Sequence, residues 1–481
     1  MKNTATNWSS CPDCQGRGKK SKGISKKARD RYQVELEQFE KSDRQGIVPT
    51  LPKGHLYSCL NCNGSGLVAT TSPPIPDLEN YPHIAIIGGG IGGVALAVAC
   101  LHRGIPFTLY ERDTNFEARS QGYGLTLQQA SKAIAGLGIQ SLKEGVVSTK
   151  HLVHTTDGEI IGEWGNRKWM PQTEKKTPKR SNIHIARQSL RLALLQQLGT
   201  NENVKWGHQL VDYKELADKS ISLTFEVNGA IQHAKADLVV GADGIRSSVR
   251  KFMIGETISP LRYLDCIVIL GICPLKALEG VSSDLLDSAT VFQTANGHER
   301  IYMMPYTKDS VMWQLSFPML ENEAVELSVQ GPHALKAEAC RRLQWHDPIP
   351  QILAATDEAQ ISGYPVYDRE LLKLELLENA GPITLIGDAA HPMSPFKGQG
   401  ANQALLDALQ LARGIAKSCG PSSNWKKKGL REILLKEFEA DMIERTAVKV
   451  KDSAAAAEFL HSETVLHEGN QPRGSLKKKG K

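Results

Sequence analysis

The feature that most constrains the fold is a run of glycines between a short apolar segment and a helical one. The apolar residues HIAIIG lead into Gly88-Gly89-Gly90-Ile91-Gly92-Gly93, which opens the helical pattern IGGVALAVACLHRG. A G-x-G-x-x-G run between a strand and a helix is typical of a dinucleotide-binding βαβ unit. There Gly88 permits the tight turn, Gly90 lets the backbone approach a pyrophosphate, and Gly93 lets the helix pack closely on the strand. We therefore expect an α/β fold whose helix N-terminus faces phosphates.

An acidic residue follows where this fold requires one. Glu111 ends the next strand-like segment, FTLYE. A carboxylate there can accept hydrogen bonds from a ribose diol, and it would repel a 2′-phosphate. A glycine-rich turn without a ligand is the alternative, but strand, helix and acid together favour a dinucleotide. The motif alone does not choose between NAD and FAD.

Strand-like and helical segments alternate from residue 83 onward, interrupted by segments typical of antiparallel hairpins. We expect a Rossmann-like nucleotide-binding domain interrupted by an α+β substrate domain with a mainly antiparallel sheet, plus a small N-terminal cysteine module. The expected ranges are 1–71 for the cysteine module, 72–82 for a proline-rich linker, 83–150, 181–256 and 370–418 for the nucleotide domain, 151–180 and 257–369 for the substrate domain, 425–465 for C-terminal helices and 466–481 for a basic disordered tail.

Composition narrows the class of protein. Of the 481 residues, 41% are hydrophobic and 23% charged, as in an ordinary globular protein. The formal net charge of +6 gathers in residues 15–58 and 472–481, so we expect no nucleic-acid partner. The first ten residues carry no apolar signal core, and no apolar run nears the ~20 residues of a membrane span. The nine cysteines are too scattered for a disulfide scaffold, which favours a reducing, cytoplasmic location.

Two further motifs identify the cofactor. Residues 241–250, GADGIRSSVR, resemble the "DG" motif of the single-component (class A) flavin-dependent aromatic hydroxylases, and residues 387–408, GDAAHPMSPFKGQGANQALLDA, are similar to their "GD" motif. The resemblance covers roughly residues 83–415 and is nearest to the tetracycline-inactivating monooxygenases. It implies an FAD site, and beside the glycine run and Glu111 it assigns cofactor contacts to Arg119, Arg187, Asp243, Gly244, Asp388, Pro395, Gly398, Gly400, Ala401 and Asn402.

The chemistry of these residues suits that assignment. Asp388 ends the apolar run ITLIG, and its carboxylate can accept a hydrogen bond from a ribityl hydroxyl. Residues 398–402 open a helix whose N–H groups can face the pyrimidine end of a flavin and stabilise its anionic reduced state. By resemblance, Pro395 lies against the isoalloxazine ring. Arg119 and Arg187 have an alternative interpretation as ordinary surface arginines.

The resemblance also implies a reaction. NAD(P)H, a transient co-substrate, reduces FAD; oxygen adds to give a C4a-hydroperoxide; and a small aromatic or polycyclic substrate is hydroxylated. One dinucleotide fingerprint in the chain agrees with NAD(P)H having no domain of its own. A flavin oxidase or reductase without oxygen insertion is the nearer alternative, and a non-catalytic scaffold with a flavin fold is the more distant one.

The substrate wall is expected on the strands of residues 258–318. Candidates are Tyr302, Met303, Met304, Trp313 and Gln314, of which adjacent residues must face opposite ways. His391 is interpreted as structural, and no catalytic base is assigned.

The N-terminal module carries two copies of C-x-x-C-x-G-x-G. Its cysteines, Cys11, Cys14, Cys59 and Cys62, supply the four thiolates of a tetrahedral zinc site, and the repeat resembles the cysteine-rich zinc domain of DnaJ-type chaperones. We expect one structural zinc ion; a redox-active dithiol is the alternative. The charged residues between the two pairs are expected to form a helical hairpin. The module is a candidate docking site for a protein partner.

Overall fold

The computed structural model describes residues 6–46, 48–52, 54–118, 123–128, 130, 133–165, 182–199 and 202–472. A five-stranded, wholly parallel sheet lies at its centre, in the strand order β12-β6-β5-β16-β22. These strands are β5 (Ile84–Ile87), β6 (Phe107–Glu111), β12 (Val204–Trp206), β16 (Leu238–Gly241) and β22 (Ile383–Leu385). Their runs IAII, LVVG and ITL are buried throughout, as expected of a parallel sheet covered on both faces.

Helices and a small sheet cover these faces. Helix α2 (Ile91–Leu101) packs against α3 (Arg187–Leu198) and α8 (Gly400–Ser418), and α4 (Ser248–Ile254) follows β16. An antiparallel sheet of β13 (Gln209–Glu215), β14 (Ile221–Val227) and β15 (Ala230–Ala236) joins the same core. There Phe225 of β14 stacks on Tyr110 of β6 at 4.3 Å between ring centroids.

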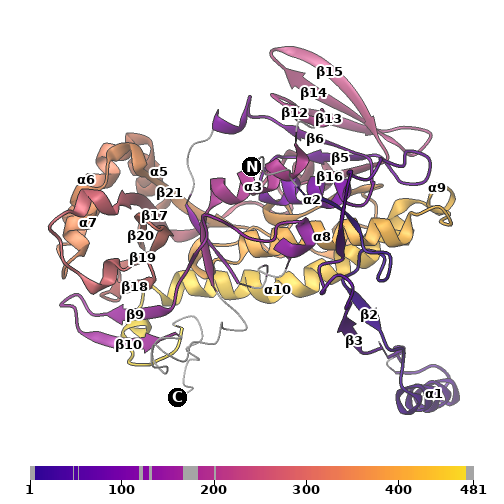
Figure 1. The fold of residues 1–481 in the computed structure, drawn as a ribbon, viewed down its shortest axis with the longest axis horizontal. Coiled ribbons are helices and arrows are strands. Elements are labelled where there is room, and N and C mark those ends of the chain that lie inside the picture. The colour runs from indigo at the N-terminus through magenta and orange to yellow at the C-terminus, as the bar shows by residue number, and fades with distance from the viewer. Residues whose placement is uncertain are drawn as a thin grey trace.

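A seven-stranded sheet forms the other half of the molecule, in the order β10-β9-β18-β19-β20-β17-β21. All neighbours are antiparallel except β9 and β18. Its strands are β9 (Lys150–His154), β10 (Ile160–Trp164), β17 (Arg262–Pro274), β18 (Thr290–Ala295), β19 (Arg300–Thr307), β20 (Ser310–Pro318) and β21 (Ile361–Asp368). Helices α5 (Glu321–Gln330), α6 (Pro332–Arg342) and α7 (Ile349–Ala355) gather on its outer side, away from the parallel sheet (Figure 1). The expected combination of a parallel and a mainly antiparallel sheet is confirmed.

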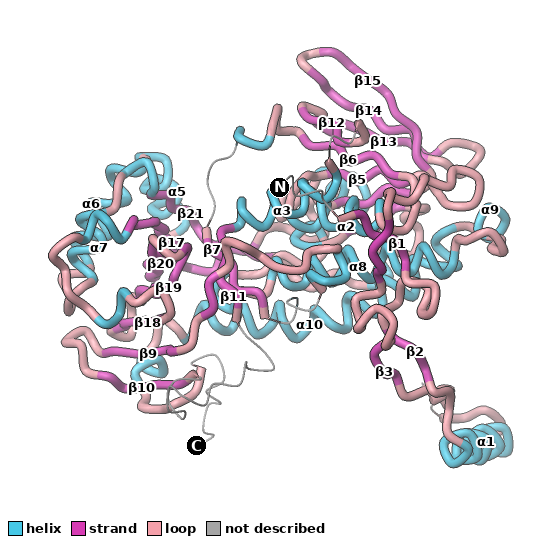
Figure 2. The backbone as a smooth tube through the Cα atoms, viewed as in Figure 1, coloured by secondary structure: helices cyan, strands magenta, loops and turns pink. Residues whose placement is uncertain are grey.

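Two elements connect the halves. The small sheet β7-β11-β8 lies between them (Figure 2), with β7 (Gly124–Leu127), β8 (Val146–Val147) and β11 (Ile183–Ala186). After α9 (Trp425–Lys428) and a π-helical turn (Arg431–Leu435), helix α10 (Lys436–Phe459) runs beneath both halves and contacts α8 and β17. Within the described ranges, no helix is long and apolar enough to span a bilayer.

The N-terminal residues form a small unit with a projecting arm. Strand β1 (Asn7–Ser10) pairs with β4 (Leu67–Thr70), and β2 (Lys19–Ser21) pairs with β3 (Leu56–Ser58). Beyond β2 and β3 a single helix, α1 (Lys26–Lys41), points away from the body (Figure 1). The expectation of a helical hairpin here is wrong. The segment after α1, SDRQGIVPTLPKG, is rich in glycine and proline, which cannot sustain a second helix.

The C-terminal end differs from the expected disordered tail in its first residues. Gly469 donates its N–H to the carbonyl of Ile161 at 3.0 Å, and the side chain of Asn470 accepts from the N–H of Glu163 at 3.0 Å. These contacts attach the chain to the edge strand β10, which offers unpaired backbone groups. Residues 473–481 lie outside the described residues.

Candidate functional site

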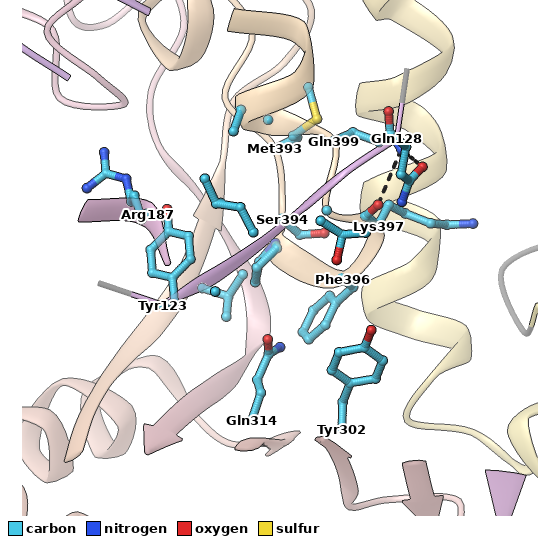
Figure 3. A pocket seen from close by; sticks show the side chains of 18 of the residues that line it. Tyr123, Gln128, Arg187, Tyr302, Gln314, Met393, Ser394, Phe396, Lys397 and Gln399 are labelled. Carbon is cyan, nitrogen blue, oxygen red and sulfur yellow. Dashed lines mark hydrogen bonds between the residues drawn. The ribbon is translucent and has the colours of Figure 1, made fainter. Parts of the chain in front are cut away.

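A cavity of about 830 Å³ lies between the carboxyl ends of the parallel strands and the seven-stranded sheet. Ligands in open α/β folds bind at this edge of the sheet. The loops after β5, β16 and β22 form one side, and Figure 3 shows Tyr302, Gln314 and Phe396 grouped at another. Of the residues expected at the cofactor, Gly90, Arg187, Gly244, Asp388, Pro395, Gly398, Gly400 and Ala401 line it.

The three glycines of the β5–α2 turn have different surroundings. A Cβ on Gly93 would lie 1.9 Å from the carbonyl oxygen of Gly88, so only glycine allows α2 this close to β5. Gly88 has φ of +109°, and a Cβ there would lie 2.5 Å from the carbonyl oxygen of Ala242. A Cβ on Gly90 would meet nothing nearer than the Arg187 guanidinium at 4.0 Å. Gly88 and Gly93 therefore shape the turn, and Gly90 leaves its backbone open to the cavity.

Glu111 supports this turn from behind and does not line the cavity. Its carboxylate accepts the N–H of Gly89 at 2.6 Å and that of Asp113 at 3.0 Å. The Arg191 side chain donates to the carbonyl oxygen of Gly89 at 2.7 Å. The backbone of the turn is thus held by an acidic and a basic side chain, with the acid 8% exposed.

Asp243 and Gly244 have separate positions in the DG segment. The Asp243 carboxylate accepts the N–H of Ser248 at 2.7 Å and the hydroxyl of Ser247, so it caps the start of α4 instead of facing the cavity. Burial raises the pKa of this carboxyl group. Gly244, with φ of +83° and no atom near its missing side chain, is the residue of this pair that lines the cavity.

Asp388 follows β22 and lines the cavity beside the start of α8. Desolvation by the surrounding cavity wall raises the pKa of its carboxyl group, and His391 and Arg187 only partly oppose this shift. The Arg187 guanidinium lies over the ring of Tyr123, 5.6 Å from its centroid. Figure 3 shows these two side chains next to each other. Asp388 is therefore an exposed hydrogen-bonding group at the strand edge, with a cation nearby.

The first turn of α8 reaches the cavity at Gly400 and Ala401. Gly398, before it, is left-handed with φ of +58°, and helix starts leave N–H groups without intrahelical partners. Asn402 lies behind this turn, where its side chain donates to the carbonyl of Thr126 at 2.9 Å and accepts from the N–H of Gln128 at 2.9 Å. It therefore ties β7 to α8 and does not line the cavity.

An unused acceptor lies at the same turn. The side chain of Gln399 donates to that of Gln128 at 2.7 Å, but within the described chain its buried Oε1 has no hydrogen-bond partner. This acceptor, the open glycine backbone and the cavity-lining Asp388 fit the amide and hydroxyl groups of a flavin nucleotide.

His391 lies outside the cavity wall, in agreement with its structural interpretation. Its Nε2 lies 2.7 Å from an oxygen of Asp407, and that carboxylate also accepts the N–H of Gly387 at 2.9 Å. Desolvation raises the pKa of Asp407, but His391 and Arg445 outweigh it and lower the pKa overall. The group fixes the GD loop against α8 and α10.

The expected substrate wall divides by strand alternation. Tyr302, Met304 and Gln314 line the cavity, whereas Met303 and Trp313 face the core behind the sheet. There the Trp313 indole N–H donates to the hydroxyl of Thr356 at 2.9 Å.

Several cavity residues escaped the sequence analysis because they come from distant segments. They are Tyr123, Thr126, His151, Trp164, His184, Gln293, Arg300, Tyr364, Phe396, Lys449, Asp452 and Phe459. Only Phe396 belongs to a recognised motif. Arg300 is buried, donates to the Gln293 side chain at 2.9 Å and lies 5.0 Å from the Tyr302 ring centroid. Burial lowers the Arg300 pKa to about 10, which leaves it cationic at neutral pH.

A hydrogen-bonded series borders the cavity on β7, β8 and β11. The hydroxyl of Thr126 lies 3.0 Å from His184 Nδ1, whose Nε2 lies 2.7 Å from the hydroxyl of Ser148. The same hydroxyl lies 3.4 Å from His151, whose ring stacks on Trp164. Desolvation lowers the pKa of His184 to about 3, so its imidazole is neutral there. Arg119 lies outside the described residues.

The four N-terminal cysteines form a second site. The sulfur atoms of Cys11, Cys14, Cys59 and Cys62 all lie within 4.8 Å of one another and are buried. Backbone N–H groups approach two of them, Gly18 to Cys14 and Gly66 to Cys62, each at 3.2 Å. A tetrahedral zinc with Zn–S near 2.3 Å separates its sulfurs by ~3.8 Å. The 3.7 Å between Cys14 and Cys62 and the 4.0 Å between Cys11 and Cys59 fit that geometry.

Comparison with known proteins points the same way. Residues 82–423 match the family described as "FAD binding domain". Zeaxanthin epoxidase from Nicotiana plumbaginifolia is 28% identical over 369 residues, covering 73% of this chain and 52% of that protein. The chain therefore spans about half the length of that relative. Aurachin C monooxygenase/isomerase from Stigmatella aurantiaca is 29% identical, covering 69% of this chain and 80% of that one.

Solved structures share the fold. The Klebsiella pneumoniae HpxO structure with FAD and uric acid superposes with a TM-score of 0.64 at 21% identity, covering 80% of this chain and 90% of that one. The 2,6-dihydroxypyridine-3-hydroxylase of Arthrobacter nicotinovorans has a TM-score of 0.64 at 19% identity, covering 81% and 94%.

Proposed function

The chain belongs to the FAD-binding-domain family, an enzyme family that includes FAD-dependent monooxygenases, and from this premise we propose that it uses NAD(P)H and oxygen to insert one oxygen atom into a small aromatic or polycyclic substrate. One observation carries the proposal. A single cavity joins the flavin-binding strand edge to an apolar, aromatic wall of the seven-stranded sheet. Pockets for one ligand span roughly 300–1,000 Å³, so its size suits a flavin ring beside a small molecule.

The protein's part is to bind and orient the FAD. The N–H groups at the start of α2 favour its phosphates, and Asp388 offers an acceptor to a hydroxyl of the ribityl chain. The first turn of α8 presents N–H groups and a positive dipole end, which stabilise negative charge at the flavin's pyrimidine ring. When bound, FAD supplies hydride acceptance and oxygen activation.

The substrate side of the cavity supplies contact area and a few polar anchors. Tyr302 and Met304 present apolar surface, while Gln314 and Arg300 offer hydrogen-bond donors. An apolar pocket with few polar groups suits an aromatic ring system. Helix α10 packs against this side and supplies Lys449, Asp452 and Phe459 to the cavity wall, where it would help to exclude water from the reacting groups.

The proposed NAD(P)H is a transient partner. The chain has one dinucleotide fingerprint, and the resemblance assigns it to FAD. NAD(P)H would therefore approach the flavin without a domain of its own.

The test is aerobic NADH and NADPH consumption by the FAD-loaded protein, with product masses recorded. The panel holds phenols, polycyclic aromatics and a ring-containing isoprenoid alkene, because one relative is a zeaxanthin epoxidase. A compound that accelerates consumption and gains one oxygen atom is the expected result. Consumption with only hydrogen peroxide formed favours the oxidase alternative, and a flavin that is never reduced favours the scaffold.

We propose in addition one structural zinc ion at Cys11, Cys14, Cys59 and Cys62. Their separation, burial and N–H···S contacts support it. Elemental analysis of the purified protein is expected to give one zinc per chain. Iron in its place, or four freely titrating thiols, would contradict the assignment.

A reducing, cytoplasmic location is proposed from the nine cysteines, none of which forms a disulfide in the structure. Fractionation of the native host tests it. Recovery with an organelle, as the name of the chloroplastic relatives suggests for those proteins, would overturn it.

A further inference from the structure

The cysteine site lies against the two helices that begin at the cofactor cavity. Helix α2 starts beside Gly90 and ends at Leu101, just before Arg103. Helix α8 starts at Gly400, and Arg413 lies in its second half. Both arginines reach the cysteine module from the helix ends that point away from the cavity.

The contacts are to the backbone of the cysteine loops. The carbonyl oxygen of Gly16 accepts from Arg103 Nη2 at 3.2 Å and from Arg413 Nε at 3.1 Å. The carbonyl oxygen of Ser65 accepts from Arg413 Nη2 at 3.0 Å. Gly16 and Ser65 belong to the loops just after Cys14 and Cys62. Two guanidinium groups thus hold both C-x-x-C loops.

These guanidinium groups have no carboxylate partner among the described residues. Arg103 is 6% exposed, and its Nε is buried without a hydrogen-bond partner in that part of the chain. Burial and the neighbouring Arg413 lower the pKa of Arg103 to about 10, and Cys100 and Cys14 oppose this shift. Desolvation lowers the pKa of Arg413, and Cys14 and Cys62 oppose it. A cation as buried as Arg103 is costly unless an anion is nearby. The four-cysteine site is the potential anion that Arg103 and the half-buried Arg413 approach.

The charge balance selects one state of that site. Four neutral thiols leave both cations uncompensated, and four thiolates alone carry four negative charges. Four thiolates around a divalent metal carry two, which two guanidinium groups neutralise. The negative dipole ends of α2 and α8 would repel such a centre without the intervening arginines.

We propose that Arg103 and Arg413 are the counter-ions of a zinc tetrathiolate at Cys11, Cys14, Cys59 and Cys62. This metal centre clamps the far ends of α2 and α8. As a result, zinc and FAD stabilise each other's binding. The inference rests on the zinc of the proposed function and not on the oxygenation reaction. Both helices are continuous from the clamp to the cavity, where Gly90 and Gly400 lie. A change in their packing at one end therefore reaches the other.

The first measurement is zinc retention against a chelator by the full-length protein. Arg413→Gln and Arg103→Gln are expected to weaken zinc binding about 10- to 100-fold, as loss of groups around metal ligands commonly does. Lys417→Gln is the matched control, because Lys417 is an exposed cation on the same helix. Arg413→Lys keeps the charge and is expected to retain more zinc than Arg413→Gln. Retention equal to wild type in both glutamine variants would overturn the counter-ion role.

The second measurement is linkage. The FAD dissociation constant is compared in zinc-loaded and zinc-depleted protein, and zinc affinity is compared with and without saturating FAD. The factor by which zinc changes the FAD affinity must equal the factor by which FAD changes the zinc affinity, because coupling between sites is reciprocal. We expect weaker FAD binding without zinc, and an unchanged constant would overturn the clamp. Cobalt(II) substitution provides a spectroscopic check, since a tetrahedral thiolate spectrum is expected and its absence contradicts the site.

These readouts are independent of turnover. A protein that shows both effects but oxygenates no substrate contradicts the monooxygenase proposal and supports the clamp. A protein that oxygenates substrate but has the same FAD affinity with and without zinc supports the monooxygenase proposal and contradicts the clamp.

Discussion

Among single residues, the glycines of α2 distinguish tight packing from open space. Gly93→Ala places a methyl group 1.9 Å from a backbone carbonyl oxygen, which cannot move without shifting β5. We expect the free energy of unfolding to fall by ~3 kcal/mol or more. Gly92→Ala is the control, since its nearest neighbour is the Ala404 methyl at 3.4 Å. Urea unfolding of both variants measures the difference; equal stability would show that β5 and α2 are not packed as described.

Asp388 provides a residue-scale test of the cofactor site. Asp388→Asn keeps the shape but removes a charged acceptor, and hydrogen bonds to charged groups contribute about 1.5–3 kcal/mol. FAD affinity is therefore expected to fall roughly 10- to 100-fold. Asp452→Asn removes a carboxylate from α10 in the same cavity wall and is expected to retain near-normal affinity. Flavin fluorescence titration of both variants is the measurement, and equal affinities would remove Asp388 from the site.

Among the elements, the arm that carries α1 contributes little to the body of the protein. Helix α1 has no buried residue. The chain departs towards α1 at Gly23 and returns from it at Gly54, and these two glycines lie side by side. Replacing residues 24–53 by an Asn-Gly turn would therefore close the β2–β3 hairpin. We expect zinc content, FAD affinity and melting temperature to stay near wild type.

The comparison for the arm is replacement of the 24-residue helix α10, which packs beneath both halves and whose loss is expected to unfold the protein. Loss of zinc on arm replacement would show that α1 supports the cysteine site. Partner docking at the arm stays a prediction, for which this variant is the natural probe.

Across the whole molecule, stability depends on buried neutral histidines. Desolvation lowers the pKa of His184 to about 3 and that of His102 to about 4, below the 6.5 of an unfolded chain. The unfolded protein therefore binds more protons below pH 6.5. Stability is greatest above that pH and falls towards pH 4, by up to ~1.4 kcal/mol per pH unit for each histidine.

Chemical unfolding from pH 7.5 to 4.5 measures this slope. His184→Gln is expected to flatten it. The exposed His233→Gln, on β15, serves as control and is expected to leave it unchanged. An equal slope in the His184 variant would mean that this imidazole is not buried in its neutral form.

Local motifs were predictable because their requirements lie in neighbouring residues. The turn at Gly88, Gly90 and Gly93 needs small residues in a set order, and the GD segment sets Asp388 and the start of α8 together. The cysteine pairs are equally local. Asp243 and Asn402 show the limit: no local pattern indicated that their side chains cap a helix and tie a strand to a helix. Their contact with the cofactor stays a prediction.

The sequence by itself determined the nucleotide fold, the flavin family and the four-cysteine site. Glycine conformations, acids at strand ends and the spacing of thiols each depend only on residues that are close together in the chain. Tertiary structure decided which side chains share the cavity, since β7, β19, β21 and α10 meet there only through packing. It alone placed Arg103 and Arg413 at the cysteine loops. Contacts between residues hundreds of positions apart follow from the burial of two sheets against shared helices, and no local pattern specifies them.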